Sequence, residues 1–171
     1  MPRYVAFLRG VSPMNAKMPD LIRAFEAAGF SRVKTVISSG NVVFDHEGAP
    51  VDELERLAEQ AMTDTLGKSF GTTVRPVDHL IRVVDADVHQ AFDPPATAKR
   101  LITFLKRPHE GQVELPLRGN DAAILKLEGV EVFSHYLPNE QGPLFMTMLE
   151  KAFGKQITTR TVDTVRKCIK A

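Results

Sequence analysis

The side chains best suited to chemistry in this chain are basic, hydroxyl-bearing and amide groups that fall in expected loops. The candidate ligand-binding set is Arg9, Lys17, Ser38, Ser39, Gly40, Asn41, Thr159 and Arg160. The planar guanidinium group of arginine and backbone N–H groups bind phosphate and carboxylate, and hydroxyls and amides add further polar contacts. If the fold brings these segments together, they form a polar site for a small anionic ligand.

Each candidate also has a purely structural interpretation. Arg9 could pair with a carboxylate, residues 38–41 could form only a hairpin turn, and Thr159 could only cap the last helix. The sequence leaves both interpretations open, because the candidates come from distant parts of the chain.

Catalytic and metal chemistry find little support in the sequence. The serines have no Gly-x-Ser-x-Gly context, and Cys168 is expected to be a packed or idle thiol on the terminal helix. The histidines lack an HExxH spacing and have no cysteine pairs nearby, so we expect surface histidines and no metal site. They are His46, His79, His89, His109 and His135. No cofactor is expected, and no reaction can be named.

Two other function classes remain as alternatives. The first is a non-enzymatic interaction or dimerisation module that uses a sheet edge or an open sheet face, so we expect a monomer or a homodimer. The second, nucleic-acid binding, is disfavoured. The chain's formal charge is only +1, and no basic, aromatic RNA-binding consensus is present. The chain also has neither GxxxxGK[ST] nor GxGxxG, which sets aside nucleotide binding by a standard motif.

Composition indicates an ordinary globular protein. Of the 171 residues, 43% are hydrophobic, which is enough for a core, and 25% are charged. The single cysteine cannot form an intrachain disulfide, and no apolar run approaches the ~20 residues that cross a bilayer. The first residues lack the succession of basic, apolar and small residues that is typical of a signal peptide. We therefore expect a cytoplasmic protein with no membrane segment.

The first half of the chain predicts the order β-α-β-β-α-β. Strands are expected over residues 3–9, 35–37, 42–44 and 72–77, and helices over residues 19–28 and 51–66. The Gly40-Asn41 pair favours a tight hairpin turn, since both residue types tolerate positive φ. This order is ferredoxin-like: an antiparallel sheet of four strands with two helices on one face.

The second half predicts a degenerate copy of the first. A helix over residues 79–89 leads to a proline-rich boundary, followed by strands over 100–106, 122–127 and 130–137. Glu128-Gly129 is the expected hairpin turn, and residues 108–119 are an expected loop. A helix over 144–153, a short polar segment over 157–160 and a final helix over 161–169 complete the half. The expected fold is α+β, with two ferredoxin-like halves over 1–78 and 99–171, a helix and linker over 79–98, and a C-terminal helix.

Four segments of the chain together resemble a known family. They are VAFLRG at 5–10, MPDL at 18–21 leading to AGF at 28–30, VKTVISSGNVVF at 33–44, and TTR at 158–160 followed by TV at 164–165. In this order the chain resembles the domain-of-unknown-function 1697 family of uncharacterised bacterial proteins, over nearly its whole length. The resemblance implies an α+β fold of two ferredoxin-like halves, and it implies no established activity.

Overall fold

A computed structural model gives the fold and describes residues 1–37, 40–119, 121–138 and 144–171. The described residues form five α-helices and two antiparallel sheets, which confirms the expected α+β class. The chain divides into two compact units, one made of Met1–Val83 with Thr164–Ala171 and the other of Val84–Asp163. No described helix is both long enough and apolar enough to cross a membrane.

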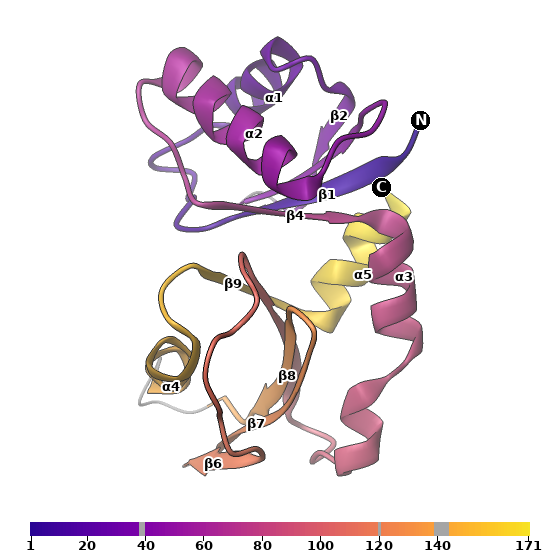
Figure 1. The fold of residues 1–171 in the computed structure, drawn as a ribbon, viewed down its shortest axis with the longest axis vertical. Helices are drawn as coiled ribbons and strands as arrows, with labels where there is room; N and C mark the ends of the chain where they lie inside the picture. The colour runs from indigo at the N-terminus through magenta and orange to yellow at the C-terminus, as the bar shows by residue number, and fades with distance from the viewer. Residues whose placement is uncertain (38–39, 120, 139–143) are drawn as a thin grey trace. The chain divides into compact units, whose positions relative to one another are not determined.

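The first unit is built on a sheet whose strand order is β2-β3-β1-β4 (Figure 1). Its elements are β1 (Arg3–Leu8), α1 (Met18–Ala27), β2 (Ser31–Thr35), β3 (Asn41–Asp45), α2 (Val51–Leu66), β4 (Thr72–Pro76) and most of α3 (Val77–Asp85). Helices α1 and α2 lie on the same side of this sheet (Figure 1).

The core of the first unit lies between those two helices and the sheet. The cluster joins alternate residues of β1 to residues of both helices. It includes Tyr4, Ala6, Leu8, Leu21, Phe25, Leu54 and Met62. The intervening β1 residues Val5 and Phe7 are also fully buried. The expected buried strand at the start of the chain is therefore confirmed, and burial of this apolar area supplies the main driving force for folding.

The second unit is built on a sheet of order β6-β7-β8-β5-β9. Its elements are the 3₁₀ helix η1 (Val88–Phe92), β5 (Lys99–Leu105), β6 (Leu117–Gly119), β7 (Ala122–Glu128), β8 (Glu131–Tyr136), α4 (Leu144–Phe153) and β9 (Ile157–Thr161). Phe145 and Leu149 of α4 pack on Leu101, Ile124 and Val132 of the sheet. Helix α5 (Val162–Lys170) follows, and its residues from Thr164 onward belong to the first unit.

Both expected hairpin turns are displaced in the structure. β2 ends at Thr35, Ile37 lies in the connection with a φ of 50°, and Asn41 is already the first residue of β3. The two-residue turn between β7 and β8 is Gly129-Val130, not Glu128-Gly129, because Gly129 supplies the positive φ of 63° that such a turn needs at its first position.

Two further expectations at the boundary and in the second half are wrong. The expected helix over 79–89 begins two residues earlier and ends at Asp85, since Asp87 adopts a left-handed φ of 43° and a separate 3₁₀ helix follows. The expected loop over 108–119 contains the short strand β6, which pairs with the start of β7. Three residues are too few for a hydrophobic alternation to be visible in the sequence.

Candidate functional site

The end of β1 brings three distant backbone segments of the first unit together. The N–H of Leu8 donates to the carbonyl of Gly40 at 2.7 Å, and the N–H of Arg9 donates to the carbonyl of Gly71 at 2.8 Å. Arg9 is half-buried. Leu8, the neighbour of Arg9 in the chain, is therefore hydrogen-bonded to the central hairpin through Gly40, and Arg9 is bonded to Gly71.

The loop that follows β1 holds the start of α1 at this same end. Nδ2 of Asn15 donates to the carbonyl of Gly10 at 2.9 Å, and its Oδ1 accepts from the N–H of Ser12 at 2.8 Å. These bonds fold the loop back on itself. Lys17, the exposed residue immediately before α1, lies two residues beyond Asn15. Its part in a ligand site stays a prediction.

Asn41 and Gly40 have structural roles in the hairpin. Nδ2 of Asn41 donates to the carbonyl of Val36 at 3.1 Å, and the N–H of Val36 donates to the carbonyl of Asn41 at 2.9 Å. Asn41 is only 3% exposed, and Gly40 has a φ of 80°. The amide of Asn41 thus closes the turn. The predicted ligand residues Ser38 and Ser39 lie outside the described residues.

The remaining predicted site residues, Thr159 and Arg160, lie on β9 in the second unit. The hydroxyl of Thr159 is 2.7 Å from the hydroxyl of Thr103, which links β9 to β5. Nη1 of Arg160 donates to the carbonyl of Thr159 at 2.9 Å. Both side chains therefore make contacts within their own sheet, and their part in a ligand site stays a prediction.

An ion-pair cluster that was not expected from the sequence lies at the opposite end of the first sheet, where β1 begins and β3 ends. Nη1 of Arg3 is 2.7 Å from Oδ1 of Asp45, and Nη1 of Arg32 is 3.0 Å from Oδ2 of Asp45. Burial alone would raise the pKa of Asp45, but the hydrogen bonds and charges of Arg3 and Arg32 outweigh it, so the pKa lies below its ordinary value. Arg3 and Asp45 are register partners on β1 and β3.

Two histidines are buried in the second unit, which corrects the expectation of surface histidines. Nε2 of His89 lies 2.9 Å from the carbonyl of Leu101 and 3.0 Å from that of Ser134, so it donates its proton between two strands. Burial lowers the pKa of His89, and burial together with the charge of Arg118 lowers that of His135. The pattern of the sequence gave no signal for this burial. Among the described residues, no group of three or more His, Cys, Asp or Glu side chains could hold a metal ion.

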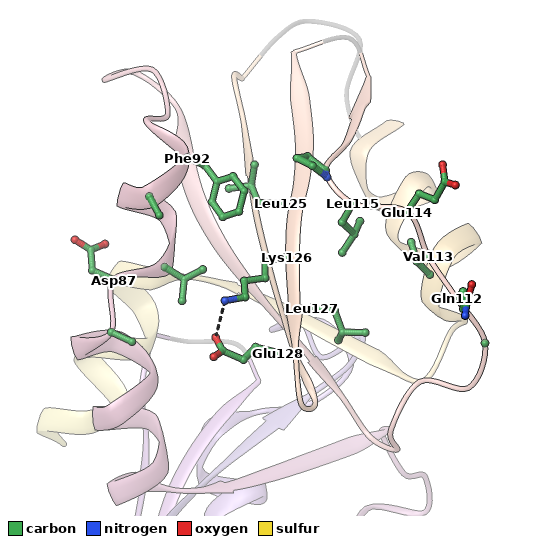
Figure 2. A pocket seen from close by; sticks show the side chains of 15 residues that line it. Asp87, Phe92, Gln112, Val113, Glu114, Leu115, Leu125, Lys126, Leu127 and Glu128 are labelled. Atoms are coloured by element: carbon green, nitrogen blue, oxygen red, sulfur yellow. Dashed lines mark ion pairs between the residues drawn. The ribbon is translucent and has the colours of Figure 1, made fainter.

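The second unit also contains a hollow of about 980 Å³ beside β7 (Figure 2). Its lining comes from three segments: residues 86–92, residues 111–116 and the last four residues of β7, Leu125 to Glu128. Lys126 and Glu128 point to the side of Asp87, and Leu127 points to the side of Leu115 and Val113 (Figure 2). The Lys126 ammonium is 4.0 Å from the Glu128 carboxylate. Sequence analysis placed no site here.

Comparison with known proteins gives a family and a fold. A family model described as "Protein of unknown function (DUF1697)" matches residues 1–133. A conserved bacterial protein, SP0830 from Streptococcus pneumoniae, has a similar solved structure, with a TM-score of 0.73 and 16% sequence identity. The match covers 99% of this chain and 97% of that one. None of the curated proteins matches the chain.

Proposed function

Since this chain belongs to the DUF1697 family of proteins of unknown function, its role has to come from its own geometry, and we propose that it binds a small anionic ligand at the end of β1. The ligand has a phosphate or carboxylate group. The observation that supports this proposal is a pair of backbone hydrogen bonds at the end of β1: Leu8 bonds to Gly40 of the hairpin, and Arg9 bonds to Gly71, the residue before β4.

The residue types of the proposed site suit an anion. A guanidinium presents a planar fork that matches the two oxygens of a carboxylate or phosphate, and Lys17 adds a second positive charge. Arg9 is half-buried, and partial removal from water strengthens a charge-assisted hydrogen bond. Gly40 and Asn41 lie in the hairpin next to it. The predicted part of Thr159 and Arg160 in anion binding is tested separately.

We also propose that each unit is ferredoxin-like. In the first unit β1 lies between β3 and β4, with β2 outside β3, and in the second β5 lies between β8 and β9, with β7 outside β8. This shared order, with antiparallel pairing throughout, supports a common split-βαβ plan. The second unit departs from the plan between β5 and β7, where the described residues contain β6 and no helix.

A thermal-shift experiment tests the ligand proposal. The wild-type protein is melted with inorganic phosphate, a sugar phosphate, a nucleotide or citrate. A ligand at ten times its Kd adds about 1.4 kcal/mol to the unfolding free energy, which raises Tm by about 3–6 °C for a chain of this size. Arg9→Gln should remove this shift, and Lys17→Gln should reduce it.

The matched control is Arg56→Gln, which removes an exposed arginine from α2. It should leave the anion-induced shift unchanged, whatever it does to the Tm without ligand. The proposal is contradicted if no anion raises the Tm of the wild type, or if Arg9→Gln and Arg56→Gln respond alike. Arg160→Gln, measured in the same way, decides whether the second unit takes part.

A further inference from the structure

A row of side chains crosses four strands of the second sheet. Arg118 of β6 is the register partner of Ala123 of β7. His135 of β8 has two register partners, Ala123 of β7 and Arg100 of β5. Register partners carry their side chains on the same face of a sheet, with Cβ atoms about 5 Å apart. We call these four residues, Arg118, Ala123, His135 and Arg100, the cross-strand row.

The cross-strand row lies on the face of the sheet away from α4. Leu101 and Ala122, the chain neighbours of two members of the row, pack in the core beneath α4. Successive residues of a strand face opposite sides, so the row points the other way. On that side the ring of His89 in η1 meets the ring of Phe133 edge-on, with centroids 5.6 Å apart. Phe133 is two residues before His135, so η1 lies on the same face as the row.

The imidazole of His135 is buried in the middle of the row, and the two arginines at its ends reach solvent. His135 is 8% exposed, and its Nδ1 is buried with no hydrogen-bond partner among the described residues. Arg118 is exposed, and the side chain of Arg100 is 37% exposed. A buried ring nitrogen without a partner is costly, and in native proteins it commonly marks a position where a water molecule or an ion binds. Nδ1 of His135 can therefore bond to a ligand that lies beside two guanidinium groups.

The charges around His135 favour a negatively charged ligand. Burial lowers the pKa of this imidazole, and the charges of Arg118, His89 and Arg100 lower it further. Each of these three groups is a cation or becomes one on protonation, so the electrostatic potential at the imidazole is positive. Among the described residues, no carboxylate acts on His135 in the opposite direction.

The excess positive charge belongs to Arg118, at the β6 end of the row. Asp87 of the segment before η1 balances Arg100 at 3.4 Å, and Gln90 accepts a hydrogen bond from Nη2 of Arg100 at 3.3 Å. The side chain of Arg118 forms no hydrogen bond or ion pair with any described residue. Ala123 separates Arg118 from His135 and has no polar side-chain group to compete for an anion. The uncompensated charge and the buried Nδ1 are thus on the same side of the row.

We propose that the cross-strand row binds a small oxyanion, the size of a sulfate or phosphate group, between Arg118 and His135. The guanidinium of Arg118 binds two oxygens of the anion, Nδ1 of His135 donates to one of them, and Arg100 adds its charge from the other side. The exposed Arg118 makes the first contact with an anion from solvent. The site lies wholly in the second unit and does not depend on Arg9 or Lys17.

Nuclear magnetic resonance of the histidine rings tests the proposal. The probe is sulfate, whose charge does not change near neutral pH, compared with chloride at equal ionic strength. Chloride is the necessary reference, because salt screening alone raises a pKa that positive charges have lowered. Sulfate should produce saturable shifts of the His135 ring signals and should raise the pKa of His135 above its value in chloride, since a bound anion stabilises the imidazolium. A water molecule at Nδ1, without an anion, would produce neither change.

Two exposed arginines of the second unit provide the variant and its matched control. Arg118→Gln should weaken sulfate binding, followed at His135, by about threefold to tenfold, because it removes charge-assisted hydrogen bonds to the anion. Arg107→Gln, outside the row, should leave the affinity unchanged. Arg9→Gln should also leave it unchanged, so failure of this site and failure of the site at the end of β1 are separate results. The proposal is overturned if sulfate and chloride affect His135 alike, or if Arg118→Gln and Arg107→Gln bind sulfate equally.

Discussion

The two sheets, of four and five strands, differ in how the backbone edges of their strands are covered. In the first unit α2 lies along the edge strand β4, where the carboxylates of Glu59 and Glu55 accept the N–H groups of Thr72 and Val74 at 3.1 and 2.9 Å. In the second unit the end of β7 has no such cover among the described residues. An open strand edge is a template for pairing with another chain. The difference is that a helix of the same unit satisfies N–H groups of β4, whereas no described strand continues the pairing along the end of β7.

The largest expected effect tests whether the β4 edge depends on its carboxylates. Glu55 is 1% exposed, so Glu55→Ala leaves the buried N–H of Val74 without this acceptor and opens a cavity. We expect a loss of about 2–4 kcal/mol in the unfolding free energy, measured by urea denaturation. Glu53→Ala, on the exposed face of the same helix, should stay within about 0.5 kcal/mol of wild type. Equal losses in both variants would show that the edge needs no such cover.

The next prediction concerns Asp45, which ties β1 to β3 in the first unit. Asp45→Asn should lower the unfolding free energy by about 1.5–3 kcal/mol at pH 7, because Arg3 and Arg32 lose their charged acceptor. The pKa of Asp45 is lower in the folded state than in the unfolded state. Its contribution is therefore present above about pH 4, the ordinary aspartate value, and is lost as the pH falls through the folded pKa. Denaturation of both proteins from pH 7 to pH 3 measures this: the variant should have the flatter profile.

The second unit should respond to acid earlier than the first. Burial lowers the pKa of His89 in the folded state, so the unfolded chain takes up its proton first and stability falls as the pH drops below about 6.5. His135 acts in the same direction. Amide hydrogen exchange at pH 7 and pH 5 should show protection lost from β5 and β8 before β1 and β3.

His89→Asn provides the check on that order. The variant should lower the unfolding free energy by about 1 kcal/mol at pH 7, because its hydrogen bonds to Leu101 and Ser134 are weaker. It should also reduce the difference in amide protection between pH 7 and pH 5. If β1 and β3 lose protection first, or if the variant keeps the full pH response, His89 is not the acid-sensitive group.

The sequence predicted what depends on local patterns and missed what depends on distant contacts. The buried strand at Val5 and Phe7 follows from an apolar run rich in β-forming residues, and the amphipathic helix α2 follows from hydrophobic periodicity; both are present. The burial of His89 was not predictable, because its two acceptors are 12 and 45 residues away in the chain. For the candidate site, the sequence could not show whether Arg9 and the hairpin lie close together. It also did not predict the hydrogen bond from the Asn41 amide to Val36 or the hollow beside β7, since both depend on strand register.

The smallest expected effect compares the two hairpin turns. In the β7–β8 turn of the second unit, the left-handed residue is Gly129, with a φ of 63°. In the connection from β2 to β3 of the first unit, it is the β-branched Ile37, with a φ of 50° and 44% of its surface exposed. A β-branched residue is strained in this region and asparagine is not, so Ile37→Asn should raise the unfolding free energy by about 0.5–1 kcal/mol. Gly129→Ala should lower it by a similar amount. Urea denaturation measures both.

The anion-induced shift in the Tm of Ile37→Asn then tests whether the strained backbone of Ile37 takes part in anion binding. Strained backbone persists where the surrounding structure or a ligand requires it. If the turn is part of the proposed anion site, relaxing Ile37 should raise the Tm without ligand and shrink the shift produced by phosphate or citrate. A variant that is more stable and keeps the full shift would place the ligand on Arg9 and Lys17 alone, with the turn as a plain connection between β2 and β3.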